Sequence, residues 1–390
     1  METSARARIV GVDVTRGLAV LGMFTAHLGN DDQWRLWNGS SGLEVADGRS
    51  AAGFALLAGV SAALLSGGSR PLTGARMQHA RVRVLARAAL LWPLGALMMA
   101  LGTPVIVILP SYAVMFAATA GVLTWRPRTL LITAAAVMVV APPLVLVARD
   151  QMATWVRVPQ LVDIVVGSYY PAASWMAYLL VGLAVGRMDL RAPATLRRLL
   201  VGGAAAAVVG LAVSAVAGRS IAPEHTFRRA LLTTEPHSSS GVELLANIGV
   251  VLVVLAGCLW LAGRFPRLVW PVAATGALAL TAYCVHLVVI AALGRGVVFD
   301  PSNVRVVAFV AVTLVLTSAW RATLGRGPLE RALHVVSTSV ADAVVPDGRR
   351  PPAIPDATGG LGATGATGAP DATGAIGAAA TRDDAADPAR

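Results

Sequence analysis

Residues 8–27 read RIVGVDVTRGLAVLGMFTAH, a run in which most residues are apolar or small. At about 1.5 Å of rise per residue, a helix of this length reaches across a bilayer core about 30 Å thick. Similar apolar runs recur along the 390-residue chain, which is 56% hydrophobic and only 14% charged. Soluble domains carry about 25% charged residues. The sequence therefore predicts an all-α polytopic membrane protein.

Apolar runs between charged breaks predict about ten transmembrane helices. Their expected positions are 9–28, 51–67, 88–102, 104–124, 129–148, 170–186, 199–217, 241–262, 269–292 and 304–320. The chain contains no lysine, so all 32 basic residues are arginines. With the N-terminus in the cytoplasm, the larger share of them falls in cytoplasmic segments, as the positive-inside rule requires. We expect a multi-pass protein of the plasma membrane with both termini in the cytoplasm.

The net charge of +11 could suggest nucleic-acid binding. The arginines are scattered between apolar runs, however, where they serve better as anchors of cytoplasmic loops and as partners of anionic lipid. The sequence therefore predicts the lipid bilayer as a partner and no nucleic acid.

Three predicted outer loops are long and carry mixed polar chemistry, at 29–50, 149–169 and 218–240. Long loops of this kind are usually functional or disordered, and their Trp, His, Asp and Arg content argues for function. Residues 341–390 are instead rich in Ala, Gly, Thr and Pro and cannot bury enough apolar surface to fold. We expect a membrane domain over residues 1–340 and a disordered cytoplasmic tail over 341–390.

The first predicted span contains ionisable residues, which are costly in a membrane and are usually paired or functional. Asp13 and Arg16 are three residues apart, so they can pair on one helix face. Alternatively, Arg16 faces a cytoplasmic pocket for a phosphorylated ligand, because a guanidinium binds phosphate in a bidentate manner. His27 lies eleven residues later, about 16 Å along the axis and roughly 20° around it. Arg16 and His27 therefore lie on one face of the predicted helix. This arrangement predicts an anion contact near one membrane face and a titratable base near the other.

Further polar residues lie at the predicted outer ends of later spans. Asp47 and Arg49 precede the second span, where a carboxylate can orient a histidine or a substrate hydroxyl. His237, Ser238 and Glu243 form a possible second polar group at the start of the eighth span. His237 is either part of a site or a solvated loop residue.

His286 lies inside the ninth predicted span, near its outer end. It is either catalytic or a core histidine bonded to a backbone carbonyl or to Thr281. Small residues in the second span predict close helix packing: Ala52, Gly53, Ala55, Ala58, Gly59 and Ala62.

These motifs resemble a known family. The opening run, followed by WNG at 37–39 and VADGRSAAGFALLAGVS at 45–61, resembles the N-terminus of the heparan-α-glucosaminide N-acetyltransferase-like membrane proteins and their DUF418 and DUF1624 relatives. Arg16-Gly17 and His27 match the pattern of the wider transmembrane acyltransferase superfamily. Three later stretches resemble the C-terminal region of DUF418 proteins: PHSSSGVELLANIGVVLVVL at 236–255, GALALTAYCVHLVV at 276–289 and WRATLGRGPLERAL at 320–333.

The resemblance, over roughly residues 6–333, implies an acyltransferase of the bacterial cell envelope. It implies cytoplasmic acyl-CoA, chiefly acetyl-CoA, as donor and an extracytoplasmic hydroxyl or amine as acceptor, such as a glycan or glycolipid. Arg16 and Asp13 would then belong to the donor site. His27 would act as general base or accept the acyl group, Asp47 would orient it, and Arg49 would bind the acceptor or stabilise the oxyanion. No metal ion is expected, and the protein can be an oligomer.

Two other classes of function are compatible with the sequence. A multi-span transporter of a small solute suits the intramembrane charges and the interrupted runs VIVILPSYAVMF (105–116) and VVAPPLVLV (139–147). The absence of visible internal repeats and the concentration of polar residues on one side argue against it. A non-catalytic envelope protein is the third possibility.

Overall fold

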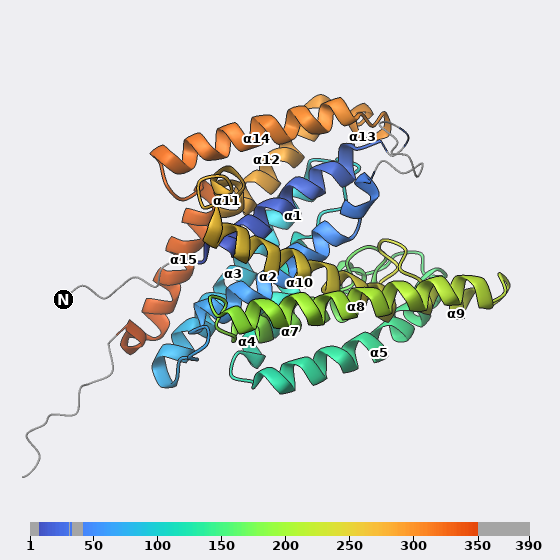
Figure 1. Ribbon diagram of the computed structural model, residues 1–390, viewed down its shortest axis with the longest axis horizontal. Coiled ribbons are helices and arrows are strands. Elements are labelled where there is room, and N and C mark those ends of the chain that lie inside the picture. Colours follow the sequence, from blue (N-terminus) through green and yellow to red (C-terminus); the bar gives the residue numbers. More distant parts are fainter. Residues whose placement is uncertain (1–7, 31, 33–41, 350–390) are drawn as a thin grey trace, which may run out of the picture. The chain divides into compact units, whose positions relative to one another are not determined.

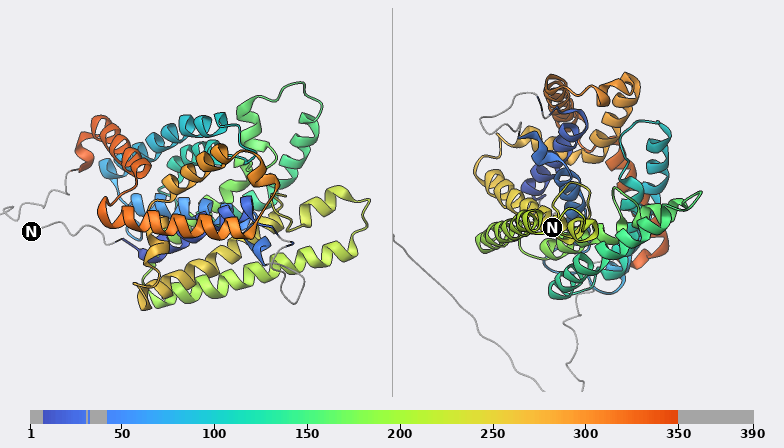
Figure 2. Two further views of the ribbon diagram at one scale, coloured as in Figure 1. Left: turned by 90° about the horizontal axis from the view of Figure 1, so that it is seen from above. Right: turned by 90° about the vertical axis from the view of Figure 1, so that its right-hand side faces the viewer.

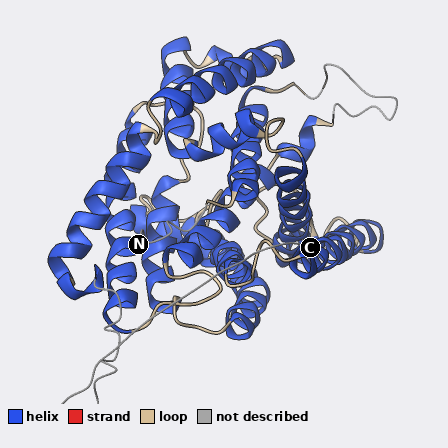
Figure 3. Ribbon diagram, turned by 60° about the vertical axis from the view of Figure 1, so that its left-hand side comes forward, coloured by secondary structure: helices blue, strands red, loops and turns tan. Residues whose placement is uncertain are grey.

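The computed structural model describes residues 8–30, 32 and 42–349, and every regular element in these ranges is helical (Figures 1 and 3). Within them, six helical segments are long and apolar enough to cross a membrane: Leu43–Leu65 (which joins η1 and α2), α3 (Gly74–Ala100), α5 (Pro127–Met152), α8 (Pro193–Ser220), α10 (Gly241–Arg264) and α14 (Asn303–Thr323). A bent pair, α11 (Trp270–Ala277) and α12 (Ala279–Leu293), makes up to seven. The all-α, multi-pass membrane class is confirmed.

A helix forms at each of the ten predicted spans, but three of these helices differ from ordinary spans. Helices α4 (Leu109–Val122) and α7 (Ala172–Gly186) have 14 and 15 residues, whereas a perpendicular crossing needs about 20. Helix α1 (Val10–Leu28) carries Asp13, Arg16 and His27, which lower its hydropathy. Most residues of α1 and α7 are buried. Figure 2 shows α1, the dark blue helix, among the other helices. The count of ten crossings stays a prediction.

Helix α3 begins at Gly74, well before the expected start of a span at residue 88. Its first half, ARMQHARVRVLAR, is too polar for a hydropathy argument to include. Arg, Ala, Leu, Met and Gln are nevertheless strong helix formers, so the segment extends the helix at its polar end. The expected start of this helix at residue 88 is therefore wrong, and Arg83 and Arg87 lie on the helix rather than in the segment before it.

The prediction of one continuous span at 269–292 is also wrong, because α11 and α12 are bent by 80°. The break is at Leu278, whose φ of −113° and ψ of 27° are not helical. The backbone N–H groups of Leu280 and Thr281 donate to the carboxylate of Glu330, at 2.8 and 3.0 Å. Glu330 therefore caps the start of α12, a position where helix N–H groups otherwise lack partners.

The long predicted loops contain short helices: η1 (Leu43–Ala46), α6 (Gln160–Val166) and α9 (Thr226–Leu232). The four-residue α13 (Gly296–Phe299) precedes α14. Helix α15 (Pro328–Val344) and the turn η2 (Pro346–Arg349) continue the helical part past residue 340. The rest of the predicted tail, and the Trp37-Asn38-Gly39 motif, lie outside the described residues.

Helices α2 (Arg49–Leu65) and α7 pack with their backbones in contact. A Cβ atom added at Gly59 would overlap the carbonyl oxygen of Leu179, and one added at Gly182 would overlap that of Leu56. This confirms the close packing predicted from the small residues of the second span. Cys258 and Cys284 are buried free thiols on α10 and α12.

Candidate functional site

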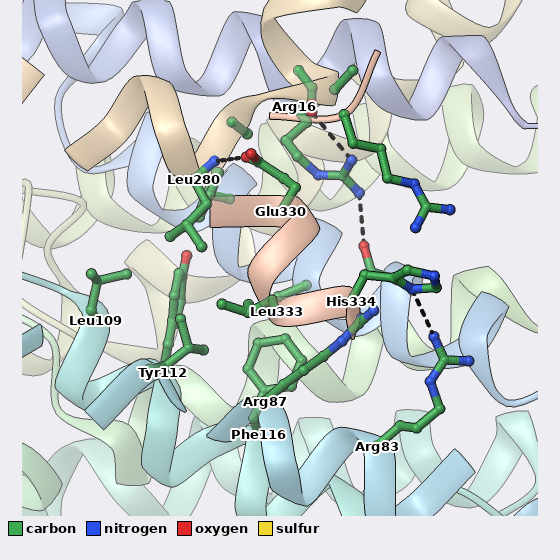
Figure 4. Close-up of a pocket in the computed structure, with 18 of the residues that line it drawn as sticks. Arg16, Arg83, Arg87, Leu109, Tyr112, Phe116, Leu280, Glu330, Leu333 and His334 are labelled. Carbon is green, nitrogen blue, oxygen red and sulfur yellow. Dashed lines mark hydrogen bonds between the residues drawn. The ribbon is translucent and has the colours of Figure 1, made fainter. Parts of the chain in front are cut away.

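A cavity of about 440 Å³ opens among α1, α2, α3, α4, α11, α12 and α15 (Figure 4). Its wall contains one carboxylate, Glu330, and five arginines: Arg8, Arg16, Arg83, Arg87 and Arg326. Arg83 and Arg87 are four residues apart on α3, so they lie on one helix face. The cavity therefore has a strongly basic wall built from three separate parts of the chain.

Arg16 has both of the roles considered for it, an ion pair and a place in a pocket wall. Its guanidinium donates to the carboxylate of Asp13 at 3.0 Å and to the hydroxyl of Ser61 at 2.7 Å. It also lines the cavity. Asp13 is buried and pairs with Arg8 as well. Asp13 thus neutralises only one of the two guanidinium charges that contact it.

Five arginines and one carboxylate give the cavity wall a net positive charge. The carboxylate oxygens of Glu330 are engaged by Leu280, Thr281 and the Thr281 hydroxyl. Within the described part of the chain, the Arg87 guanidinium makes no hydrogen bond or ion pair. Burial and the charges of Arg326, Arg83 and Arg87 lower the pKa of His334 in the same wall. The cavity is suited to a ligand with several negative charges.

Another part of the cavity wall is apolar and aromatic. Phe54, Leu109, Tyr112 and Phe116 line it from α2 and α4, and Leu280 lines it from α12 (Figure 4). From Leu280, helix α12 continues six residues, or about 9 Å, to His286. The helix that contributes Leu280 to the cavity wall therefore also carries this histidine.

His286 forms a pair with His27, which ends α1. The Nδ1 atom of His27 lies 3.1 Å from the Nε2 atom of His286, and the two rings stack with centroids 5.3 Å apart. His286 is 3% exposed, with the rings of Phe24 and Tyr283 4.7 and 5.3 Å from its own. His27 is partly exposed. The structure thus joins two histidines that the sequence had placed in separate groups.

The expected polar group at the start of α10 is a compact hydrogen-bonded cluster around Glu243. This 2% exposed carboxylate accepts from the backbone N–H of His237 at 3.0 Å and from that of Ser239 at 2.6 Å. It also accepts from the Ser238 hydroxyl at 2.9 Å and the Asn247 amide at 3.3 Å. The Glu243 cluster, as these residues are called below, fixes the chain ahead of α10.

His237 is held in an unusual conformation within this cluster. Its φ is +63°, in the left-handed region that non-glycine residues rarely adopt. Its ring centroid lies 5.3 Å from that of Tyr170 and 6.5 Å from that of Trp175. Burial lowers the pKa of His237. These contacts exclude the alternative of a freely solvated loop residue.

Asp47 and Arg49 lie beside the Glu243 cluster rather than in contact with His27. A Cβ atom at Gly48, between them, would be 3.3 Å from a Glu243 oxygen. The Arg49 guanidinium donates to the carbonyl oxygens of Glu44 and Val45, each at 3.4 Å. His27 makes no hydrogen bond to Asp47 or Arg49 in the described ranges. The assignment of Asp47 and Arg49 to the acceptor side stays a prediction. In the described residues, Asp47 does not hydrogen-bond His27, so it does not orient that ring directly.

Several residues of these groups were not identified from the sequence. Asn247 lies four residues after Glu243 on the same helix and donates to the Tyr178 hydroxyl at 3.3 Å. The four-residue spacing could have indicated that Asn247 lies on the same helix face as Glu243. Trp175 donates its indole N–H to the Ser239 hydroxyl at 3.3 Å, but one tryptophan in an apolar run gives no such signal.

These features define a helical membrane protein with a basic cavity and with a histidine pair further along α1 and α12, two of the helices that line the cavity. Residues 8–222 match the family model described as heparan-alpha-glucosaminide N-acetyltransferase, catalytic. The chain therefore belongs to this family, and its membrane domain is of the acetyltransferase type. Residues 185–339 match the family of unknown function DUF418. No curated protein matches the chain.

Both matched regions contribute to the same cavity. Arg16, Arg83 and Arg87 come from the first, whereas Leu280, Glu330 and His334 come from the second. The His27–His286 contact joins the two regions as well. Neither region contains the whole site.

Proposed function

We propose that the protein transfers an acyl group, acetyl in the first instance, from cytoplasmic acyl-CoA to a hydroxyl or amine acceptor across the membrane. The observation that carries the proposal is the arginine-lined cavity, whose wall includes residues of α1 and α12, the two helices that also bring His27 and His286 together. Membership of the acetyltransferase family supports the reaction type.

The donor binds with its phosphates at the arginines. Arg87 supplies a guanidinium without a counter-ion in the described residues, and Arg16 supplies one oriented by Asp13 and Ser61. The acyl-pantetheine arm follows the apolar wall of Phe54, Leu109 and Tyr112 toward the histidines. The arginine distribution along the sequence favours a cytoplasmic position for this cavity, with both chain termini on the same side.

His27 acts as the general base. The acceptor O–H or N–H proton moves to Nε2 of His27 while the acceptor oxygen or nitrogen attacks the thioester carbonyl carbon. When the tetrahedral intermediate collapses, the carbon–sulfur bond breaks and the CoA thiolate takes up the proton. A route through acyl-His27 uses the same pair, with the histidine as nucleophile.

The acceptor approaches from the side of the Glu243 cluster, where Asp47, Arg49 and His237 lie. The neighbouring rings of Tyr169 and Tyr170 and the polar loop groups suit a glycan or the head of a glycolipid. Tyr169 is 49% exposed, so its ring is available for stacking.

The alternative function is solute transport. One observation favours it, namely the 80° bend between α11 and α12. Broken helices in transporters offer their free helix ends to the solute. Here the N-terminal end of α12 is already capped by Glu330. The bend is therefore better explained as a structural joint than as a binding site.

The test is binding and transfer of radiolabelled acetyl-CoA by the detergent-purified full-length protein, with glucosamine and an envelope glycolipid extract as acceptors. We expect His27→Ala to bind acetyl-CoA normally while transfer falls about 10²- to 10⁴-fold, the usual contribution of a general base. Arg87→Gln should weaken binding, whereas Arg76→Gln should not, because Arg76 is exposed and outside the cavity wall.

Failure of the wild type to bind acetyl-CoA would overturn the proposal. Transfer that persists in His27→Ala would remove His27 from its role. Counterflow of a solute into proteoliposomes without CoA would instead identify a transporter.

A further inference from the structure

Helix α15 is attached to the protein along one side. Ser337 and Ala341 are fully buried on that side. His79 on α3 contacts the carboxylate of Asp342 at 2.9 Å, and Arg83 contacts the ring of His334 at 3.4 Å. These contacts fix the rotation of α15 about its own axis.

The opposite side of α15 is an apolar stripe. Its valines are substantially exposed: Val335 53%, Val336 40%, Val340 41% and Val344 63%. Ala332, Ser339 and Ala343 are exposed between them, at the three- and four-residue spacing of one helix face. We call this surface the valine face. It carries no acidic residue, and no part of the described chain covers it.

The helix lies where a membrane surface is expected. Figure 1 shows α15 crossing the end of the bundle at a steep angle to α14. Helix α15 is not among the helices apolar enough to span a bilayer. A strongly amphipathic helix across the ends of spans is typical of an element in the interface between headgroups and acyl chains.

Basic residues and exposed apolar side chains also lie at the end of α14, in the turn after it and at the start of α15. Arg321, Arg326 and Arg331 flank the turn between α14 and α15. Leu316, on α14, and Leu324, directly after it, are exposed apolar residues, at 62% and 53%. Trp320, 37% exposed, donates its indole N–H to the Arg326 carbonyl at 3.1 Å; tryptophan is enriched at membrane interfaces.

We propose that α15 is an interfacial helix whose valine face lies in the membrane surface at the cavity end, with Arg321 and Arg331 binding anionic phospholipid headgroups. Two observations favour lipid over a second copy of the chain. Helix α15 directly follows α14, which is long and apolar enough to cross a membrane, and cationic residues lie at the start of α15 and in the turn before it. The lipid contact does not depend on what the cavity binds.

This placement links the membrane surface to the cavity. The helix that carries the valine face also supplies Leu333 and His334 to the cavity wall, and its Glu330 caps α12. The bilayer surface therefore supports one wall of the cavity from outside.

The test uses the full-length protein with Cys258 and Cys284 replaced by Ala. Val336→Cys or Val340→Cys, on the valine face, or Thr73→Cys, in an exposed turn before α3, carries an environment-sensitive fluorophore. The protein is reconstituted in vesicles of phosphatidylcholine alone or with 30% phosphatidylglycerol. We expect the valine-face labels to be quenched by brominated lipid and several-fold less by iodide than the Thr73 label.

Equal iodide quenching at all three positions would overturn the proposal, as would efficient disulfide formation between copies through Val336→Cys. Bromolipid quenching should increase with phosphatidylglycerol, and Arg321→Gln/Arg331→Gln should abolish that increase. An increase unaffected by this double substitution, or no increase in the parent protein, would overturn the assignment of the arginines.

Discussion

The contact between His27 and His286 constrains which nitrogen of each ring carries a proton. With Nδ1 of His27 and Nε2 of His286 3.1 Å apart, one of the two must be the donor. The His27 side chain is partly exposed. When Nδ1 of His27 is the donor, the Nε2 atom of the same neutral ring carries no proton. This is the state that a general base needs, so His286 is suited to position His27 by selecting its tautomer.

Substitution of His286 tests this positioning role. We predict that His286→Ala lowers the single-turnover rate of acyl transfer by about 10²-fold or more, while the Kd for CoA changes little. Cys284→Ala is the matched control, because Cys284 is buried on the same helix without contacting His27. A transfer rate equal to that of the control would show that His286 is a packing residue.

Sequence reasoning identified contacts within a helix better than contacts between helices. The pairing of Asp13 with Arg16 follows from their three-residue spacing, and the structure contains it. The contact of His27 with His286 joins positions 259 residues apart. No spacing rule reaches that far, because the contact depends on how α1 and α12 pack and on where α12 begins.

At the scale of elements, hydropathy located the helices but not their breaks and polar ends. A window averaged over residues 269–292 does not detect that Leu278 leaves the helix, since the residues on both sides are equally apolar. The cap that stabilises the break comes from Glu330, which the sequence presents only as part of a Gly-Pro-Leu-Glu motif. The polar half of α3 was missed for the opposite reason, because its arginines form a helix without being apolar.

The packing of α2 against α7 gives a prediction at this scale. Gly182→Ala places a methyl group against the carbonyl of Leu56, and overpacking of this kind costs typically about 1–3 kcal/mol. We therefore expect a lower Tm for the detergent-purified protein. Gly202→Ala on α8 is the control, since a Cβ atom there meets nothing within 4 Å. An equal Tm in both variants would contradict the backbone contact between α2 and α7.

At the scale of the whole molecule, the two family-matched regions meet at one site, and the direction of transfer depends on the orientation in the membrane. The cavity is lined in part by α3 and α15. Both helices begin at one end of the bundle, whereas α9 lies at the opposite end (Figure 1). Acyl-CoA is made in the cytoplasm, so the donor role requires the cavity end to face that compartment. Orientation and function are therefore linked.

Cysteine labelling in intact cells tests this orientation. Gln78 near the start of α3 and Glu224 before α9 are both exposed, while the native Cys258 and Cys284 are buried and give little background. We predict that an impermeant maleimide labels Glu224→Cys in intact cells and Gln78→Cys only after permeabilisation. The reverse pattern would place the five arginines of the cavity outside the cell, away from any acyl-CoA. The cavity would then need a different anionic ligand, even if every contact described within the bundle were correct.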